Sequence, residues 1–420
     1  MVISKPAAFT PYQKLVIAFL TFLQFTIIFD FMIISPLGAI LMPALNITPK
    51  QFGLAVSVYA FSAGISGLVA AGFADRFDRK RFLLFFYCGF LLGTLLCGLA
   101  NSYEMLLFAR MITGVFGGVI GSVVFAITTD LFAFEQRGRV MGFIQSAFAA
   151  SQILGLPAGM FLANLWHWHA PFYLIVGIGA VVGVIIALNL KPIKTHLESG
   201  TRNSGSALHH LQVTFSNRRY LFAFSATALL SVGGFMLMPF GSAFTVHNLG
   251  INIDRLPMIY FITGLCAMFT GPMVGKAADK FGKFNTFLFG AGLSIIMVLI
   301  YTNLGVTPLP VVIIVNAVMF VGIFSRMIPS QALMSAIPTL ETRGSFMSVS
   351  SSLQQISGGL ASVIAGYIVT EGPGGYIEHF PVLGYILVAT TLITSYQMYQ
   401  IHRRYVVEAD KPNLVQIVAE

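Results

Sequence analysis

Twelve long apolar runs dominate the pattern of hydrophobic and polar positions along the chain. Each is about 20 residues or longer, which is the length a helix needs to cross a bilayer. The runs are continuously apolar and do not alternate with polar residues, so they favour membrane-spanning helices over the strands of a barrel. Charged residues and clusters of Pro, Gly and Asn separate them. The runs lie near residues 14–40, 51–74, 82–100, 104–133, 140–163, 170–190, 219–247, 255–278, 284–303, 309–337, 344–370 and 380–401.

The longest polar interruption follows the sixth run and predicts a linker between two halves. Similar charged loops, around Asp75 and around Asp279, lie after the second run of each half, and the Arg-Gly pairs at Arg137 and Arg343 repeat at nearly the same spacing. The chain is therefore expected to be an all-α polytopic protein of two related six-helix bundles. The predicted boundaries are 1–190 for the first bundle, 191–218 for a cytoplasmic linker, 219–401 for the second bundle and 402–420 for a cytoplasmic tail.

Composition narrows the class and the orientation. A chain that is 56% hydrophobic and 9% charged cannot be a water-soluble domain, so its net charge of +9 points to membrane orientation and not to nucleic acid. If the N-terminus lies in the cytoplasm, only Lys50 and Arg255 lie on the outer side of the membrane, and Arg110 and Arg326 lie within spans. All the other Lys and Arg residues are then cytoplasmic. We expect a multi-pass protein of a bacterial inner membrane with both termini in the cytoplasm.

The charged loops carry a family resemblance. Six of the seven residues from Asp75 to Arg81 are charged. The loops, together with the six-plus-six arrangement of spans, resemble the major facilitator superfamily, whose signature is Gly-x-x-x-Asp-Arg-x-Gly-Arg-Lys/Arg. The second copy matches it at Gly275, Asp279, Lys280, Gly282 and Lys283, and the first keeps Asp75, Arg76, Arg79 and Lys80 but has Ala71 and Asp78 at the glycine positions.

Two further segments resemble the twelve-span drug:proton and sugar-efflux branch of that family. The segment from Leu107 to Gly114, which contains Arg110, resembles its helix 4 motif. The segment from Gly155 to Gly159 resembles a degenerate form of its helix 5 antiporter motif. The resemblance implies a secondary transporter that works by rocker-switch alternating access.

The charged loops are also candidates for a conformational switch. A carboxylate at Asp75 or Asp279 can face the N-terminus of a helix that starts at the same membrane surface, near Gly344 or Gly138. The resemblance implies that such contacts join the halves and that the basic residues pair with an acid at the end of the fourth span. The alternative is that the loops only enforce topology. The predicted switch residues are Asp75, Arg76, Arg79, Asp130 (with Glu135 as a second acid), Asp279, Lys280 and Lys283.

Three charged residues lie deep inside spans and away from the span ends, namely Asp30, Arg110 and Arg326. A charge in lipid costs about 2.5–3.5 kcal/mol, so all three should face the protein interior. Counting at 1.5 Å per residue puts Arg110 roughly 15 Å farther from the cytoplasm than Arg326 and near the depth of Asp30. Asp30 and Arg110 are therefore candidate proton-coupling residues: the pair would stay ionised until substrate or a conformational change separates it. The alternative is a permanent structural ion pair. For Arg326 the alternatives to a substrate role are a carbonyl partner or helix packing.

Other polar residues within spans are candidates for the substrate cavity, although each could instead form an interhelical hydrogen bond. The serine-rich span from Ser345 to Ser352 either lines the pathway or permits close packing. The predicted cavity residues are Gln24, Tyr59, Arg110, Gln145, Gln152, Tyr260, Asn316, Arg326, Gln331, Gln354 and Gln355.

The sequence contains no nucleotide-binding loop, metal-ligand motif or nucleophile motif, and its cysteines have no ligand spacing. We therefore expect no enzyme activity, cofactor or metal, and energy from an ion gradient or from the substrate's own gradient. The prediction is proton-coupled efflux of a small organic molecule, neutral or anionic, by a monomer whose partners are substrate, protons and lipid. The alternatives are a proton-linked importer or uniporter, or a lipid flippase. A membrane sensor or enzyme is disfavoured.

Overall fold

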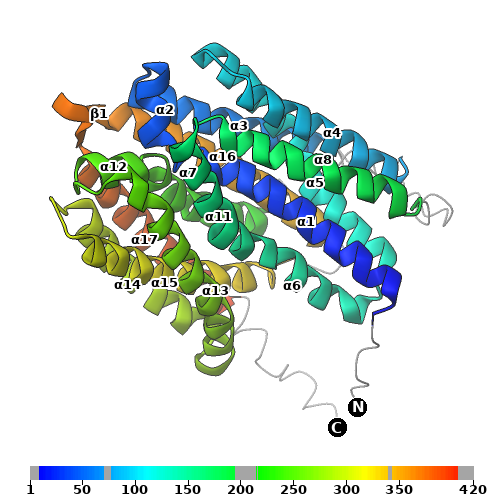
Figure 1. The fold of residues 1–420 in the computed structure, drawn as a ribbon. Helices are drawn as coiled ribbons and strands as arrows, with labels where there is room; N and C mark the ends of the chain where they lie inside the picture. Colours follow the sequence, from blue (N-terminus) through cyan, green and yellow to red (C-terminus); the bar gives the residue numbers. More distant parts are fainter. Residues whose placement is uncertain (1–8, 71–76, 194–213, 215, 339–342, 405–420) are drawn as a thin grey trace, which may run out of the picture.

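The computed structural model describes residues 9–70, 77–193, 214, 216–338 and 343–404, and within these it is almost entirely helical (Figure 1). Asp75 and Arg76, two of the predicted switch residues, lie outside the described residues, as does most of the predicted linker. The helices of the first half are α1 (Pro11–Ile33), α2 (Gly38–Leu45), α3 (Pro49–Ala70), α4 (Arg79–Gly98), α5 (Tyr103–Leu131), α6 (Phe134–Ala150), the π-helical turn η2 (Ser151–Gly155), α7 (Leu156–Leu165) and α8 (Ala170–Asn189).

The second half repeats this layout and adds a short hairpin. The strands β1 and β2 pair antiparallel between the last two long helices. The elements are α11 (Arg218–Leu237), η3 (Met238–Phe240), α12 (Gly241–His247), η4 (Ile253–Arg255), α13 (Leu256–Phe281), α14 (Lys283–Thr302), α15 (Leu309–Met334), α16 (Arg343–Ile368), β1 (Thr370–Glu371), η5 (Pro373–Gly375), β2 (Ile377–Glu378) and α17 (Phe380–His402).

Eleven helical stretches of the described chain are long and apolar enough to cross a membrane. The one predicted run that is absent from these eleven is 344–370, which forms α16. It has 26 residues and thus sufficient length, but its first half is rich in Ser and Gln. The all-α polytopic fold expected from the sequence is therefore confirmed. The helices begin and end close to the predicted boundaries, because charged and Pro-containing loops mark the ends of the apolar runs.

Three runs predicted as single helices are interrupted. The first breaks after α1, where Pro36 cannot donate a backbone hydrogen bond, and α2 follows as a separate short helix. The fifth run passes through the π-helical turn η2 just before Pro157. A π-turn accommodates the missing N–H of a proline while the helix continues. The seventh run passes through the 3-10 turn η3, which contains Pro239, between α11 and α12. The sequence predicted none of these features.

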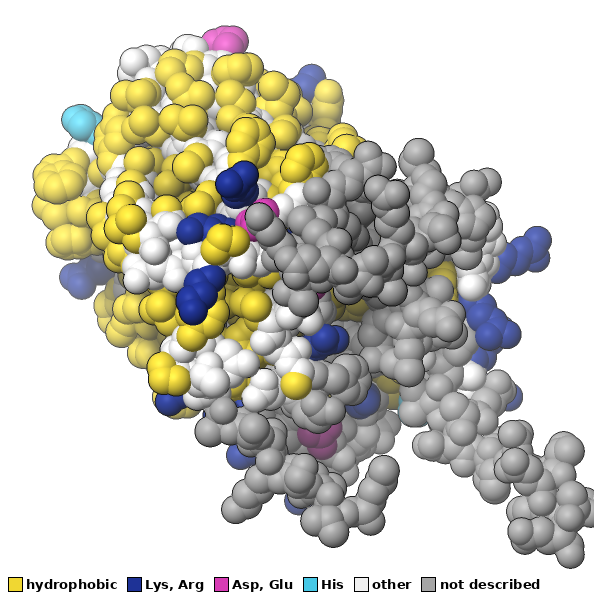
Figure 2. Space-filling view, turned by 90° about the vertical axis from the view of Figure 1, so that its right-hand side faces the viewer, with side chains coloured by type: hydrophobic (Ala, Val, Ile, Leu, Met, Phe, Trp, Pro, Cys, Tyr) yellow, Lys and Arg dark blue, Asp and Glu magenta, His cyan; other side chains and the backbone are white. Residues whose placement is uncertain are grey.

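The two ends of the bundle differ in charge. We call the end at which α1, α4 and α6 begin the basic end, and the end that carries β1 and β2 the hairpin end. Figure 2 looks onto the basic end and shows many basic side chains and few acidic ones among its described residues. Of the described basic side chains, Lys50 and Arg255 begin helices at the hairpin end.

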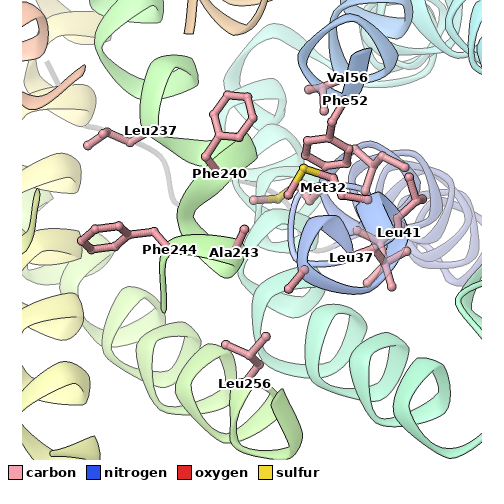
Figure 3. Packing of buried hydrophobic residues seen from close by; sticks show 14 of the residues in the cluster. Met32, Leu37, Leu41, Phe52, Val56, Leu237, Phe240, Ala243, Phe244 and Leu256 are labelled. Carbon is pink, nitrogen blue, oxygen red and sulfur yellow. The ribbon is translucent and has the colours of Figure 1, made fainter. Parts of the chain in front are cut away.

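The apolar core is shared between the halves only towards the hairpin end. There, Met32, Leu37 and Phe52 of the first half and Phe240 and Leu256 of the second half belong to one buried cluster (Figure 3). Towards the basic end the buried clusters are separate: one is built from the first half alone, and the other from the second half, with only Leu68 of α3 packed against it. The structure is thus closed at the hairpin end.

Small residues allow α3 and α16 to approach closely across the halves. A Cβ atom on Gly53 would lie 2.6 Å from the carbonyl oxygen of Ser362, and one on Gly67 would lie 3.3 Å from the hydroxyl of Ser352. Ser352 is buried. For this serine of α16 the packing alternative therefore applies.

Candidate functional site

The two charged residues deep in the first half form an ion pair. Nη1 of Arg110, from α5, lies 3.0 Å from Oδ2 of Asp30, from α1, and both side chains are fully buried. The same nitrogen lies 3.3 Å from the backbone oxygen of Asp30. The structure therefore brings together the pair that the depth estimate suggested.

A threonine completes the surroundings of the carboxylate. The hydroxyl of Thr94, from α4, lies 3.0 Å from Oδ1 of Asp30 and 3.0 Å from the carbonyl oxygen of Phe90. Its single proton can serve only one of these acceptors at a time. Both oxygens of the Asp30 carboxylate thus have a partner, one on α4 and one on α5.

The Arg110 guanidinium is only partly satisfied. Tyr59 of α3 places its ring centre 4.5 Å from the guanidinium carbon, which is a cation–π contact. Nε and Nη2 of Arg110 are buried and have no hydrogen-bond partner among the described residues. These two nitrogens lie on one edge of the planar group, which is the arrangement that binds a carboxylate with two parallel bonds. Arg110 can therefore accept a second ligand without releasing Asp30 first.

Local sequence explains why Asp30 points inward. Thr26, Ile27 and Ile33 are buried with it on α1, so the helix faces the bundle with the side that carries the acid. Gly114 of α5 allows α5 to approach α3 closely, because a Cβ there would lie 2.5 Å from the backbone oxygen of Tyr59. The close approach of α3 to α5 sets Tyr59 against Arg110.

Arg326 occupies a different position in the second half. It is buried on α15, and its Nη1 donates to the hydroxyl of Thr391 on α17 at 2.7 Å. No carboxylate of the described chain lies within ion-pair distance of it. Its guanidinium faces α11, where a Cβ atom on Gly233 would lie 3.5 Å from Nη2. Arg326 is thus a buried cation inside its own half.

The other predicted cavity residues are not gathered into one group. Tyr59 packs on Arg110, Gln152 packs its backbone against Gly264 of α13, and Asn316 donates to the carbonyl of Val312 at 2.9 Å. The remaining residues were predicted from polarity alone, and their role stays a prediction. Gln145, Gln331 and Gln354 are exposed, and Gln24, Tyr260 and Gln355 are partly buried.

Two of the predicted switch residues form an ion pair, and their role as a switch stays a prediction. Nε of Arg79, at the start of α4, lies 3.1 Å from Oδ2 of Asp130 at the end of α5, and both side chains are largely buried. Asp78 caps α4 by accepting from the backbone N–H of Arg81 at 3.1 Å. In the second half, Asp279 and Lys280 of α13 and Lys283 of α14 are exposed. The copy of the motif in the second half is therefore not engaged with the first half in this state.

Thr94, Thr391 and Gly233 were missed by the sequence reasoning. The two threonines lie mid-helix, where a threonine commonly bonds the carbonyl one turn back, so polarity alone gives no signal. Gly233 has no side chain to suggest a contact. Among the described residues, no group of three His, Cys, Asp or Glu side chains could hold a metal ion.

Comparisons with known proteins agree with this architecture. The chain is 25% identical over 380 residues to the "Uncharacterized MFS-type transporter YceJ" of Bacillus subtilis (strain 168). The matched residues cover 90% of this chain and 93% of that protein. Over 108 residues it is 39% identical to "Multidrug resistance protein 3" of the same organism, which covers 26% of this chain and 21% of that protein.

Solved structures show the same fold. A bacterial homolog of the human lysosomal transporter Spinster, inward-facing and unoccupied, superposes with a TM-score of 0.73 at 16% identity. The superposition covers 95% of this chain and 98% of that structure. The family model of the Major Facilitator Superfamily matches residues 20–395. The chain therefore belongs to the major facilitator superfamily and is a multi-pass membrane transporter, not an enzyme.

Proposed function

We propose that this transporter exports a small organic molecule in exchange for protons, with Asp30 as the proton carrier. The observation that carries the proposal is the position of Thr94 beside Asp30. When Asp30 is ionised, Thr94 donates its proton to Oδ1. When Asp30 is protonated on Oδ1, the carboxyl donates to the Thr94 oxygen, and Thr94 turns its proton to the Phe90 carbonyl 3.0 Å away. Both protonation states then keep a hydrogen bond inside the protein.

Arg110 would link the proton to the substrate. Ionised Asp30 holds Arg110 through Nη1, and the Nε–Nη2 edge has no partner among the described residues. An anionic or neutral polar group of the substrate would bind this edge. Protonation of Asp30 removes the charge that holds the arginine in place and so weakens substrate binding. By reciprocity, bound substrate lowers the affinity of Asp30 for a proton, and exchange of one for the other follows.

The shared core supports alternating access. The halves are joined at the hairpin end and have separate cores at the basic end, where Asp279 is exposed. By the positive-inside rule the basic end is cytoplasmic, and both termini with it. The bacterial relatives support a bacterial inner membrane. This state would take up substrate and release protons at the cytoplasm. In the opposite state, the charged loops would close the cytoplasmic side, with Arg79 held by Asp130 as it is here.

Two charged groups set the substrate class. Arg110 and Arg326 are opposed by one buried acid, Asp30, among the described residues of the spans. The excess positive charge favours neutral polar or anionic organic molecules. The stretch similar to Multidrug resistance protein 3 supports export. Transport of lipophilic cations alone by the reconstituted protein would contradict this substrate class.

Proton release on substrate binding tests the proposal. The protein is purified in detergent in weakly buffered medium with a pH-sensitive dye, and a panel of neutral, anionic and cationic compounds is added. We expect release with wild type and with the control Asp254→Asn, an acid at the hairpin end, and none with Asp30→Asn. Binding without release from any variant would favour a uniporter, and translocation of labelled lipid by proteoliposomes would favour a flippase. Accumulation in everted vesicles separates export from import.

A further inference from the structure

A groove runs between α1 and α6 on the first half. Its volume is about 640 Å³, and its lining includes Ile17, Phe22, Phe25, Phe143 and Leu154. The two helices run side by side towards the basic end (Figure 1). Lys14 and Arg139, both exposed, line the same groove at that end.

The groove opens to the lipid and not to the second half. Gln152 packs on Gly264 of α13 and therefore marks the side of this helix that faces the second half. Leu154 lies two residues further along the π-helical turn, roughly half a turn of the helix, and so points away from that half. Leu154 is 61% exposed and Phe143 is 48% exposed, although both lie within a span. Apolar side chains that are exposed at this depth face acyl chains.

The groove has the polarity and length of one membrane leaflet. From Lys14 to Phe25 the chain rises about 16 Å along α1, close to half of a hydrocarbon core about 30 Å thick. Its basic residues lie at one end, and its aromatic residues lie deeper. Arg139 is held at the mouth by stacking on Phe9, with the guanidinium carbon 4.5 Å from the ring centre. Among the described side chains that line the groove there is no acid.

We propose that this groove binds an anionic phospholipid of the cytoplasmic leaflet. One acyl chain lies along the aromatic wall between α1 and α6, and the phosphate and its headgroup contact Lys14 and Arg139. A zwitterionic lipid offers the same chain but no net charge, so the preference for an anionic lipid comes from the two basic residues. Each such residue near an anionic lipid contributes about fivefold in affinity, so the pair gives roughly 20-fold.

Native mass spectrometry of the delipidated full-length protein tests this proposal. Phosphatidylglycerol and phosphatidylcholine with identical acyl chains are titrated against wild type, K14A/R139A and R218A/R219A. The control pair removes two exposed basic residues from the same end of the second half. We expect wild type and the control to prefer phosphatidylglycerol by roughly 20-fold, and K14A/R139A to bind both lipids equally.

A second variant separates the groove from the charges. A18W/S146W places large side chains on both walls and should lower the affinity of the first phosphatidylglycerol to the level of later, non-specific additions. Equal affinity of wild type for both lipids, or an unchanged preference in K14A/R139A, would overturn the proposal. So would an increase in bound lipid after deletion of residues 2–8, because the N-terminal segment would then be the natural occupant.

Discussion

The hydroxyl oxygen of Thr94 lies 3.0 Å from Oδ1 of Asp30, at the one carboxylate oxygen that Arg110 does not contact. We expect Thr94→Val to lower the rate of proton-coupled transport by about tenfold or more, because a protonated Asp30 would then lack an acceptor in a buried site. Thr94→Ser keeps the hydroxyl and should retain most of the activity. Transport assays of the two variants in proteoliposomes with an imposed pH gradient check this. Equal loss in both would mean that packing, and not the hydroxyl, is what matters.

Removal of Arg110 should make stability depend on pH. In Arg110→Ala the buried Asp30 has no cation opposite, so the folded protein keeps a proton there at pH values at which the unfolded chain has already lost it. The folded state then binds more protons than the unfolded state, and stability falls as pH rises. Thermal unfolding in acidic and alkaline buffers measures this slope. The double variant Asp30→Asn/Arg110→Ala should lack it, and a slope that persists there would assign the effect to another group.

The Arg79–Asp130 pair should affect turnover more than binding. Asp130→Asn weakens a largely buried ion pair at the basic end, far along α5 from Arg110. If the pair positions the charged loop that closes the cytoplasmic side, the maximal transport rate falls by about tenfold, the equivalent of one charged hydrogen bond, while substrate affinity in detergent is unchanged. The exchanged pair Arg79→Asp/Asp130→Arg should recover part of the rate. An equal loss of affinity would place Asp130 in the binding site instead.

Gly53 should control opening of the hairpin end. Gly53→Ala places a Cβ 2.6 Å from the Ser362 carbonyl, so α3 and α16 must separate. Overpacking of this kind costs about 1–3 kcal/mol and favours the state in which the two helices part. A cysteine introduced by Phe240→Cys into a cysteine-free background should react with a maleimide at least about fivefold faster in this variant. Gly121→Ala, where a Cβ would meet nothing within 4 Å, is the matched control.

An acid on α11 should neutralise Arg326. The space at Gly233 accommodates a Cβ at ordinary contact distances, 3.5 Å from Nη2 and 3.6 Å from Nη1 of Arg326. Gly233→Asp therefore provides a counter-ion for a buried cation and should raise Tm by about 2–4 °C relative to Gly233→Asn. If Arg326 binds an anionic substrate, the same change abolishes that binding. Full substrate affinity in Gly233→Asp would leave Arg326 a structural residue.

The sequence predicted well what depends on the membrane and less well what depends on packing. The boundaries of the long helices follow from the difference between lipid and water, and the Asp30–Arg110 pair follows from depth and from the cost of a charge in lipid. Thr94 and Gly233 were not predictable in this way, because their importance lies in which helix faces them. The break at Pro36 and the π-turn before Pro157 depend on local backbone geometry inside otherwise uniform apolar runs.

The serine-rich span shows the same limit. Polarity along α16 favoured a pathway lining, whereas Ser352 faces Gly67 of α3. A buried serine and a cavity serine have the same sequence signal, and only the neighbouring helix decides between them. Asp75 and Arg76 stay predictions from the motif.

The unequal sharing of the apolar core has a thermal consequence. Parting of the hairpin end transfers side chains such as Phe240 and Leu256 from a common interior to water, while the surfaces that approach at the other end are rich in charge. The conversion should therefore carry a positive heat-capacity change, as any exposure of hydrocarbon does. Because hydrophobic association weakens on cooling, the resting balance between the two forms should drift with temperature, and cold should favour the form that opens outward.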